Sequence, residues 1–307
     1  MRKITHCINT CVILPKGLTK ETYIDIAKVY MLEALTNIGY KAEDICFCCV
    51  QGSTNYNLDI YEDSYVSDVD WKVFVFPNFH DLYYGEKVSK TYKYEDGQFE
   101  LKDIRLLPDL LAKMNSSYLE LLYSPYFYCP NEKMRKFVEE IRGYREQLLI
   151  ERLPLLMKSL KGMCLEKQNA LCHEYEGLKD KITKFGGYDP KQLHHALRIL
   201  YLMDTLSNSY FNTGKPDYET GLVLTGNKRD ILIDIKVNGV SSLEVAQQMM
   251  NKCVEDCSSF CSNFWTKDNK PIMQLEKQDG NYVSPIKDKA IKLISEAIYR
   301  VVSERFA

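Results

Sequence analysis

Three aspartates in the first third of the chain have the type and spacing expected of a metal-dependent site for phosphoryl chemistry. Asp68 and Asp70 stand two residues apart where residues 69–76 begin a strand-like run, and in a strand such residues project from one face, about 6.6 Å apart. The two carboxylates repel each other unless a cation lies between them, and their oxygens suit Mg²⁺ or Mn²⁺. Two ions about 4 Å apart activate the attacking oxygen and stabilise the leaving oxygen of an in-line displacement. Asp103, in the next expected strand, is predicted to complete the set and to accept the proton of the attacking hydroxyl.

The dipeptide Gly52-Ser53 follows a short apolar run, residues 45–50, that is typical of a strand buried on both faces. Glycine permits close approach of the backbone, and the exposed N–H groups together with the serine hydroxyl can hold a phosphate. A Gly-Ser pair is by itself most often a turn, and an Asp-x-Asp pair is most often a solvated strand edge. Their occurrence in this order, followed by a third acid on another strand, favours catalysis over either structural role.

A basic helix face is predicted in the second half of the chain. Asp189 followed by proline is a favourable helix start, and leucines and alanine then recur on one face. The opposite face carries Lys191, His194, His195 and Arg198. Such a face is usually solvated surface, but beside a metal–triphosphate site Lys191, His195 and Arg198 would neutralise phosphate charge.

Other lysines are weaker candidates for phosphate contact. Lys72 lies on the strand face that carries the second of the paired aspartates, within reach of a phosphate. Lys158, Lys161 and Lys167 could extend a positive wall along the preceding helix. A solvated, charged helix face is the ordinary interpretation of those three residues.

The elements that must position these residues begin with a helix and three strands. A helix is predicted over residues 21–37, where apolar side chains recur at helical spacing before a glycine. Strands are predicted over residues 45–50, 69–76 and 99–104.

From residue 106 onward the pattern becomes helical, with long helices over residues 132–142 and 155–175. We therefore expect two units: a compact unit of helices and strands in residues 1–125 and a mainly helical unit in residues 126–307.

Composition excludes several classes of protein. Lysine and arginine total 40, aspartate and glutamate 42, and the formal net charge is −2, which argues against a histone-like nucleic-acid coat. No apolar stretch reaches the roughly 18 residues of a membrane span, and no secretory signal is visible. The 11 cysteines are an odd number in a long chain, which predicts reduced, mostly buried thiols and a cytoplasmic protein. Cys253, Cys257 and Cys261 recur at helical spacing without a zinc pattern, so we interpret them as core residues.

The chain resembles nucleotidyltransferases of the DNA polymerase beta superfamily, whose signature is Gly-Ser, a spacer, Asp-x-Asp and a later acidic residue. The segments GSTNYNL, SDVDWKVFVFP, FELKDIRLL and YLELLYSPYF are similar to a group of predicted bacterial and phage nucleotidyltransferases, and the resemblance continues at GYDPKQLHHALRIL, so that it spans roughly residues 45–240. It implies an α+β fold: a polymerase-beta-like core with a mixed sheet and flanking helices, followed by a helical domain that completes the cleft.

The same resemblance implies roles for the motif residues. Gly52 and Ser53 would contact a nucleoside triphosphate, Asp68 and Asp70 would bind two Mg²⁺ (or Mn²⁺) ions, and Asp103 would bind the catalytic ion.

Two residues depart from the pattern of the related sequences. Asn57 stands where they usually carry glycine, and because asparagine tolerates positive φ, we expect the loop to keep its conformation. Trp71 replaces a small polar residue, which would alter the packing of a base or an acceptor.

The sequence thus predicts a metal-dependent transfer of a nucleoside or deoxynucleoside monophosphate from a triphosphate to an acceptor hydroxyl, with release of pyrophosphate. The acceptor is open between an RNA or DNA 3′ end, a second nucleotide and a protein side chain, with the first two favoured because basic faces could line a channel for phosphates. Alternatives are a non-catalytic protein that binds a nucleotide or a partner, and hydrolysis at the same metal site. A protein partner or a homo-oligomer also remains open.

Overall fold

The N-terminal part of the chain forms one mixed, five-stranded sheet. The computed structural model describes residues 19–62, 65–94, 97–173, 179–265, 276–278, 281–283 and 289–307. The strands are β1 (Ile45–Gln51), β4 (Asp70–Val75), β5 (Ser89–Tyr94), β6 (Gly97–Asp103) and β7 (Phe127–Tyr128), in the order β5-β6-β4-β1-β7. Strands β4 and β6 are parallel, and the other neighbouring pairs are antiparallel. The predicted strands and the α+β class are therefore confirmed.

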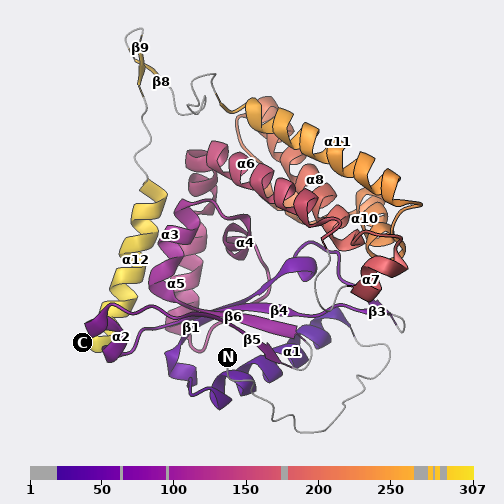
Figure 1. The fold of residues 1–307 in the computed structure, drawn as a ribbon. Helices are drawn as coiled ribbons and strands as arrows, with labels where there is room; N and C mark the ends of the chain where they lie inside the picture. Colours follow the sequence, from indigo (N-terminus) through magenta and orange to yellow (C-terminus); the bar gives the residue numbers. More distant parts are fainter. Residues whose placement is uncertain are drawn as a thin grey trace.

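Helix α1 (Lys20–Asn37) covers one face of the sheet (Figure 1). Thr19 begins it as N-cap, because its side chain accepts a hydrogen bond from the Thr22 N–H. Its apolar stripe, which includes Met31 and Leu35, packs with Trp71, Val73, Phe99 and Leu101 of the sheet in one buried cluster. The odd-numbered residues at the centre of β4 and β6 therefore face α1.

The opposite face of the sheet is covered by helices from three parts of the chain. These are α3 (Leu107–Ala112), α4 (Ser116–Leu119), α5 (Glu132–Gly143) and the C-terminal helix α12 (Lys289–Phe306). Short 3₁₀ helices connect the parts: η1 (Ala42–Asp44), η2 (Gly52–Thr54), η3 (Ile104–Leu106) and η4 (Glu120–Leu122). Helix α2 (Phe79–Tyr84) and the hairpins β2 (Tyr61–Glu62) with β3 (Tyr65–Val66) and β8 (Glu276–Gln278) with β9 (Asn281–Val283) are peripheral in Figure 1.

A helical unit follows, with α6, α8 and α11 packed against one another (Figure 1). Its helices are α6 (Arg145–Ala170), α7 (Lys179–Lys184), α8 (Pro190–Thr213), α9 (Tyr218–Leu222), α10 (Gly226–Asn238) and α11 (Leu243–Ser262). Helix α6 is kinked at Arg152, close to Pro154, which cannot donate the usual backbone hydrogen bond. Helix α8 begins as expected, with Asp189 as N-cap and proline at the first position.

The thiols of Cys253, Cys257 and Cys261 are buried in the core between these helices, which confirms that interpretation. One apolar cluster runs from the sheet, through Phe47 and Phe74, into the helical unit. The boundary near residue 125 stays a prediction. No described helix combines the length and the apolar character needed to cross a membrane.

Candidate functional site

The Gly-Ser turn lies where the sheet meets the helical unit. Helix η2 begins directly after β1, and Gly52 has φ +79°, a conformation that only glycine adopts without strain. Asn57 has φ +58°, so asparagine does occupy a left-handed position at this site, as expected. The Gly52 N–H donates to the Glu120 carboxylate at 3.1 Å. This amide is therefore already engaged, which differs from the open phosphate cradle that the sequence predicted.

Asp68 and Asp70 lie together at the start of β4. Asp70 is half-buried, its Oδ1 accepts a hydrogen bond from the Gln98 N–H at 3.3 Å, and Asp68 is exposed. Burial, followed by the negative charge of Asp68, raises the pKa of Asp70. A carboxylate pair whose mutual repulsion is only partly compensated is a donor set that fits Mg²⁺ or Mn²⁺.

Asp103 does not join this pair, which corrects the expected third ligand. In the parallel ladder Asp103 is opposite Val75, five residues along the strand from Asp70, a separation of about 16 Å. Asp103 is also two residues after Leu101, so its side chain lies on the sheet face that packs against α1. The Asp103 carboxylate is fully buried and accepts hydrogen bonds from the Arg105 side chain at 2.6–3.1 Å. It acts there as the partner of a cation and as the N-cap of η3.

The acid nearest in register on β6 is Glu100. It is opposite Lys72, and since residues paired across parallel strands share a face, it lies on the face of Asp70. Glu100 bonds to Lys72, to Lys102 at 2.8 Å and to the Tyr118 hydroxyl at 2.8 Å. Burial acts to raise the pKa of Glu100, but hydrogen bonds from Lys102 and Lys72 outweigh it and bring the pKa down to about 2.

The Lys72 side chain is correspondingly tied down. Lys72 is 4% exposed, and its ammonium lies 4.2 Å from the centre of the Tyr118 ring. It therefore stabilises Glu100 in this structure and does not project freely toward a phosphate. The alternation of apolar and charged residues in the segment FELKD was the sequence signal that separated Glu100 from Asp103.

Helix α8 places three of its predicted basic residues at the site. The exposed Lys191 acts electrostatically on Asp70, lowering the pKa of that carboxyl against the effect of burial. Burial and then the charge of Arg198 lower the pKa of His195 well below its usual range. The Arg198 guanidinium lies 3.9 Å from the centre of the Tyr56 ring. A neutral imidazole beside cations marks a region of positive potential.

His194 is not part of this surface. It is buried, and its Nδ1 is 2.8 Å from the Leu232 carbonyl of α10. Burial lowers its pKa to about 4. His194 and Arg198 are buried and do not lie on an open helix face, because α10 and the loop after η2 cover that side of α8.

Besides Glu100, two further site residues were missed in the sequence. Lys236 of α10 donates to the Leu58 carbonyl at 3.0 Å and the Ser67 hydroxyl at 3.3 Å, next to Asp68. Burial, followed by the charge of Lys191, lowers the pKa of Lys236 to about 8. Glu120 is fully buried beside the Gly-Ser turn. Its signal was a single acid inside the apolar segment YLELLY; Lys236 had no comparable signal.

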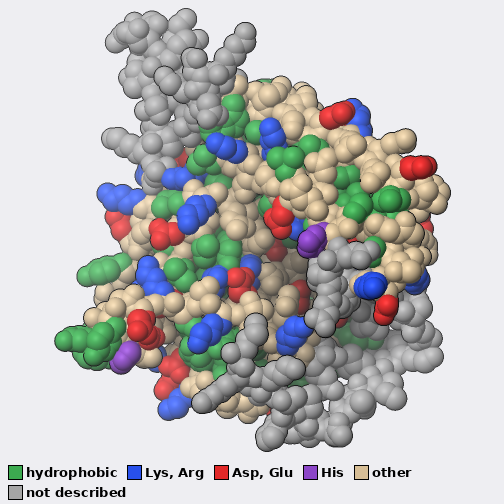
Figure 2. Space-filling model, in the orientation of Figure 1, with side chains coloured by type: hydrophobic (Ala, Val, Ile, Leu, Met, Phe, Trp, Pro, Cys, Tyr) green, Lys and Arg blue, Asp and Glu red, His purple; other side chains and the backbone are tan. Residues whose placement is uncertain are grey.

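The remaining sequence candidates lie elsewhere. Trp71 is buried on the α1 face, so it cannot contact a base at this site. Lys158 lies over the Trp265 ring at 5.0 Å, and Lys167 pairs with Glu166 at 3.3 Å while also contributing to the positive potential at His195. Figure 2 shows basic and acidic side chains interspersed on the visible face. A continuous basic wall is therefore not seen from this side.

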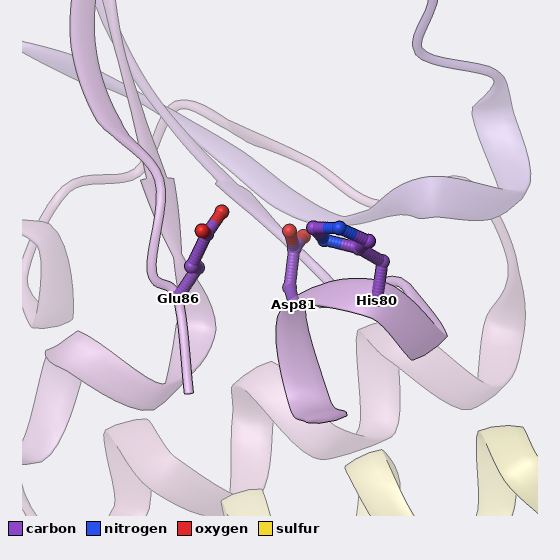
Figure 3. Close-up of side chains that lie close together, drawn as sticks. All are labelled: His80, Asp81 and Glu86. Atoms are coloured by element: carbon purple, nitrogen blue, oxygen red, sulfur yellow. The ribbon is translucent and has the colours of Figure 1, made fainter. Parts of the chain in front are cut away.

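A separate group of possible metal ligands lies on and after α2. Within the described residues, His80, Asp81 and Glu86 are the one set of three whose ligand atoms lie within 4.8 Å of one another (Figure 3). Asp81 already caps α2 by accepting a hydrogen bond from the Asn78 N–H, and the His80 ring lies against Tyr84. Helix capping and surface packing therefore account for Asp81 and His80, two of the three members of this group.

Comparison with known proteins does not identify the chain: no protein-family model and no curated protein matches the sequence.

Proposed function

We propose that the protein is a metal-dependent nucleotidyltransferase that moves a nucleoside monophosphate from a triphosphate to an acceptor hydroxyl. The observation that carries this proposal is the juxtaposition of two charge groups. Asp70, two residues after Asp68, is opposite Gln51, the residue before the Gly-Ser turn. Lys191 of α8 acts electrostatically on Asp70, and Arg198 of the same helix lies over the ring of Tyr56, just after that turn. Carboxylates suit the metal ions, and the cations suit the phosphates that those ions bridge.

Each residue group then has a defined task. Asp68 and Asp70 would hold Mg²⁺ or Mn²⁺, which when bound polarises the reacting phosphate and lowers the pKa of an oxygen nucleophile. Ser53, Lys191 and Arg198 would bind the triphosphate and neutralise the charge of the leaving pyrophosphate. Glu100 replaces Asp103 as the candidate third carboxylate. A nucleotide or nucleic-acid hydroxyl is the favoured acceptor, because its own phosphates would be attracted to the cations of α8.

A second candidate function is nucleotide binding without turnover. It is favoured by one observation: Glu100 is neutralised by Lys72 and Lys102, and the Gly52 amide is held by Glu120. In this state the third carboxylate and part of the phosphate cradle are both engaged. A nucleotide sensor needs only the carboxylate pair and the cations.

Pyrophosphate release separates the two functions. Purified protein is incubated with Mg²⁺ or Mn²⁺ and each nucleoside and deoxynucleoside triphosphate, without acceptor and then with RNA, single-stranded DNA or a protein mixture. We expect release by the wild type to fall at least about a hundredfold in Asp70→Asn, because a metal ligand is lost. The control Asp81→Asn removes a carboxylate from the group on α2 and should retain activity.

Metal-dependent triphosphate binding without release under any of these conditions would support the sensor and contradict the enzyme. Loss of activity in Asp81→Asn, with retention in Asp70→Asn, would move the metal site to α2. Labelled product separates transfer from hydrolysis, since only transfer leaves the nucleotide attached to an acceptor.

A further inference from the structure

Three buried residues from three elements meet beside the Gly-Ser turn. Tyr56 follows η2, Glu120 begins η4 and Arg198 lies in α8. Glu120 is 1% exposed and Arg198 is 6% exposed. Each charge has thus been largely removed from water, which is costly unless it is compensated.

Arg198 has little compensation from direct contacts. Its guanidinium stacks on the Tyr56 ring, but within the described part of the chain it forms no ion pair, and its buried Nε has no hydrogen-bond partner. Buried donors without a partner are uncommon in folded proteins and often mark a ligand. A guanidinium, with five N–H donors in a planar fork, is suited to phosphate oxygens.

Glu120 is linked to Arg198 through Tyr56, whose hydroxyl bonds to the carboxylate and whose ring lies under the guanidinium. One carboxylate oxygen accepts from the Gly52 N–H at 3.1 Å, and the other accepts from the Tyr56 hydroxyl. Burial raises the pKa of Glu120, and Arg198 lowers it without forming a direct ion pair. The carboxylate therefore balances the guanidinium through space and leaves the guanidinium donors open.

We propose that Glu120 is the resident counter-ion of Arg198. In the ligand-free protein Glu120 lowers the free-energy cost of the buried guanidinium charge, and it competes with an incoming triphosphate for interaction with that charge. This inference deepens the proposed function and rests on its assignment of a triphosphate to Arg198. Glu120 is a positioning residue here: it holds Gly52 and Tyr56, and through Tyr56 it supports Arg198.

The substitution Glu120→Gln removes the charge and keeps the shape. The glutamine oxygen can still accept from Gly52, and its amide can donate to the Tyr56 hydroxyl. We expect inorganic tripolyphosphate to bind this variant roughly tenfold more tightly than the wild type, because the charge of Arg198 is no longer offset by Glu120 and is fully available to the anion. Tripolyphosphate should raise the melting temperature of this variant more than that of the wild type at the same concentration, because it binds the variant more tightly.

Two comparisons make this test specific. Asp59→Asn removes another buried carboxylate of the same loop, whose partner at 2.9 Å is Lys20. It should lower the melting temperature without tightening tripolyphosphate binding beyond about twofold. In the Arg198→Gln background, Glu120→Gln should no longer tighten binding, because the charge that it balances is absent.

Isothermal titration with tripolyphosphate gives these affinities without any nucleotide transfer, so the result is independent of whether the protein is an enzyme. Unchanged or weaker binding in Glu120→Gln, or equal tightening in the Arg198→Gln background, would overturn the proposal. If Glu120→Gln is unfolded alone, tripolyphosphate should restore its near-ultraviolet circular dichroism at a concentration about tenfold lower than an unfolded Asp59→Asn requires. Failure to restore it would equally overturn the counter-ion role.

Discussion

Burial determines which ionisable side chains carry charge at the site. Asp70 is disfavoured as an anion by burial and by Asp68, and His194 is held neutral by burial. Glu100 remains strongly acidic because two lysines donate to it. The same carboxyl chemistry therefore gives a candidate cation-binding group at Asp70 and a structural anion at Glu100.

The repulsion at Asp70 leads to a prediction about stability. Asp70→Asn removes the unfavourable charge and keeps an oxygen to accept from Gln98, so the metal-free melting temperature should rise by about 1–3 °C. Addition of Mg²⁺ or Mn²⁺ should raise the melting temperature of the wild type and not that of the variant. Differential scanning calorimetry measures both effects, with the exposed Asp109→Asn as control. A lower metal-free melting temperature in Asp70→Asn, or the same rise with metal in the variant as in the wild type, would contradict the assignment of Asp70 as a metal ligand.

The buried His194 predicts a pH dependence of folding. Its pKa is about 4 in the folded protein and about 6.5 when exposed, so the unfolded state takes up the proton first as pH falls. The unfolding free energy should therefore decrease between about pH 6.5 and pH 4, with about 3 kcal/mol from this residue. Urea unfolding at a series of pH values should show a smaller decrease in His194→Asn. His80→Asn, at an exposed position, should retain the decrease of the wild type.

The loop between η2 and β4 is fixed to the helical unit by backbone contacts. The Leu224 N–H donates to the Tyr56 carbonyl at 3.0 Å, and the Asn57 side chain donates to the Leu224 carbonyl at 3.0 Å. Arg229 donates in turn to the Asn57 carbonyl at 2.8 Å. The loop that carries the Gly-Ser turn is thus held in place before any ligand binds, which lowers the entropy cost of ordering it.

Asn57 combines a side-chain hydrogen bond to Leu224 with a left-handed backbone conformation, and substitution can separate the contributions of the two to stability. Asn57→Ala loses the hydrogen bond to Leu224 and places at φ +58° a residue whose side chain cannot hydrogen-bond to the local backbone. The free energy of unfolding should therefore decrease by about 1–3 kcal/mol. Asn57→Gly loses only the hydrogen bond and should cost less, partly offset by the greater freedom of the unfolded chain. Chemical denaturation of the two variants measures the difference. Equal stability of the alanine and glycine variants would show that backbone conformation is not limiting.

At the scale of the whole molecule, the sheet belongs to two cores at once. Cys48 and Val50 of β1 pack toward α1, whereas Phe47 and Cys49 belong to the large core that extends through the helical unit. Helix α12 also returns from the C-terminal end to pack against α3 and α5. The two predicted units therefore share a packing surface.

This sharing predicts one cooperative unfolding transition. The chain has two tryptophans, Trp71 in the core below α1 and Trp265 after α11. Fluorescence of Trp265→Phe reports the sheet, and fluorescence of Trp71→Phe reports the helical unit. Each denaturation midpoint should coincide with that measured by circular dichroism on the same variant. Separate midpoints within one variant would show that the units unfold independently.

The sequence by itself determined the elements whose signals are local. The apolar run of β1, the Asp189-Pro start of α8, the glycine at the turn and the left-handed Asn57 follow from propensity and backbone sterics, which act over a few residues. The alternation in FELKD already separates Glu100 from Asp103, but only the strand register of the folded sheet places Glu100 on the face of Asp70. Tertiary structure also decided that His194 and Arg198 are buried, since a helix in isolation does not reveal how many neighbours cover it. The assembly of Tyr56, Glu120 and Arg198 depends on three distant segments packing together, and no local pattern encodes that contact.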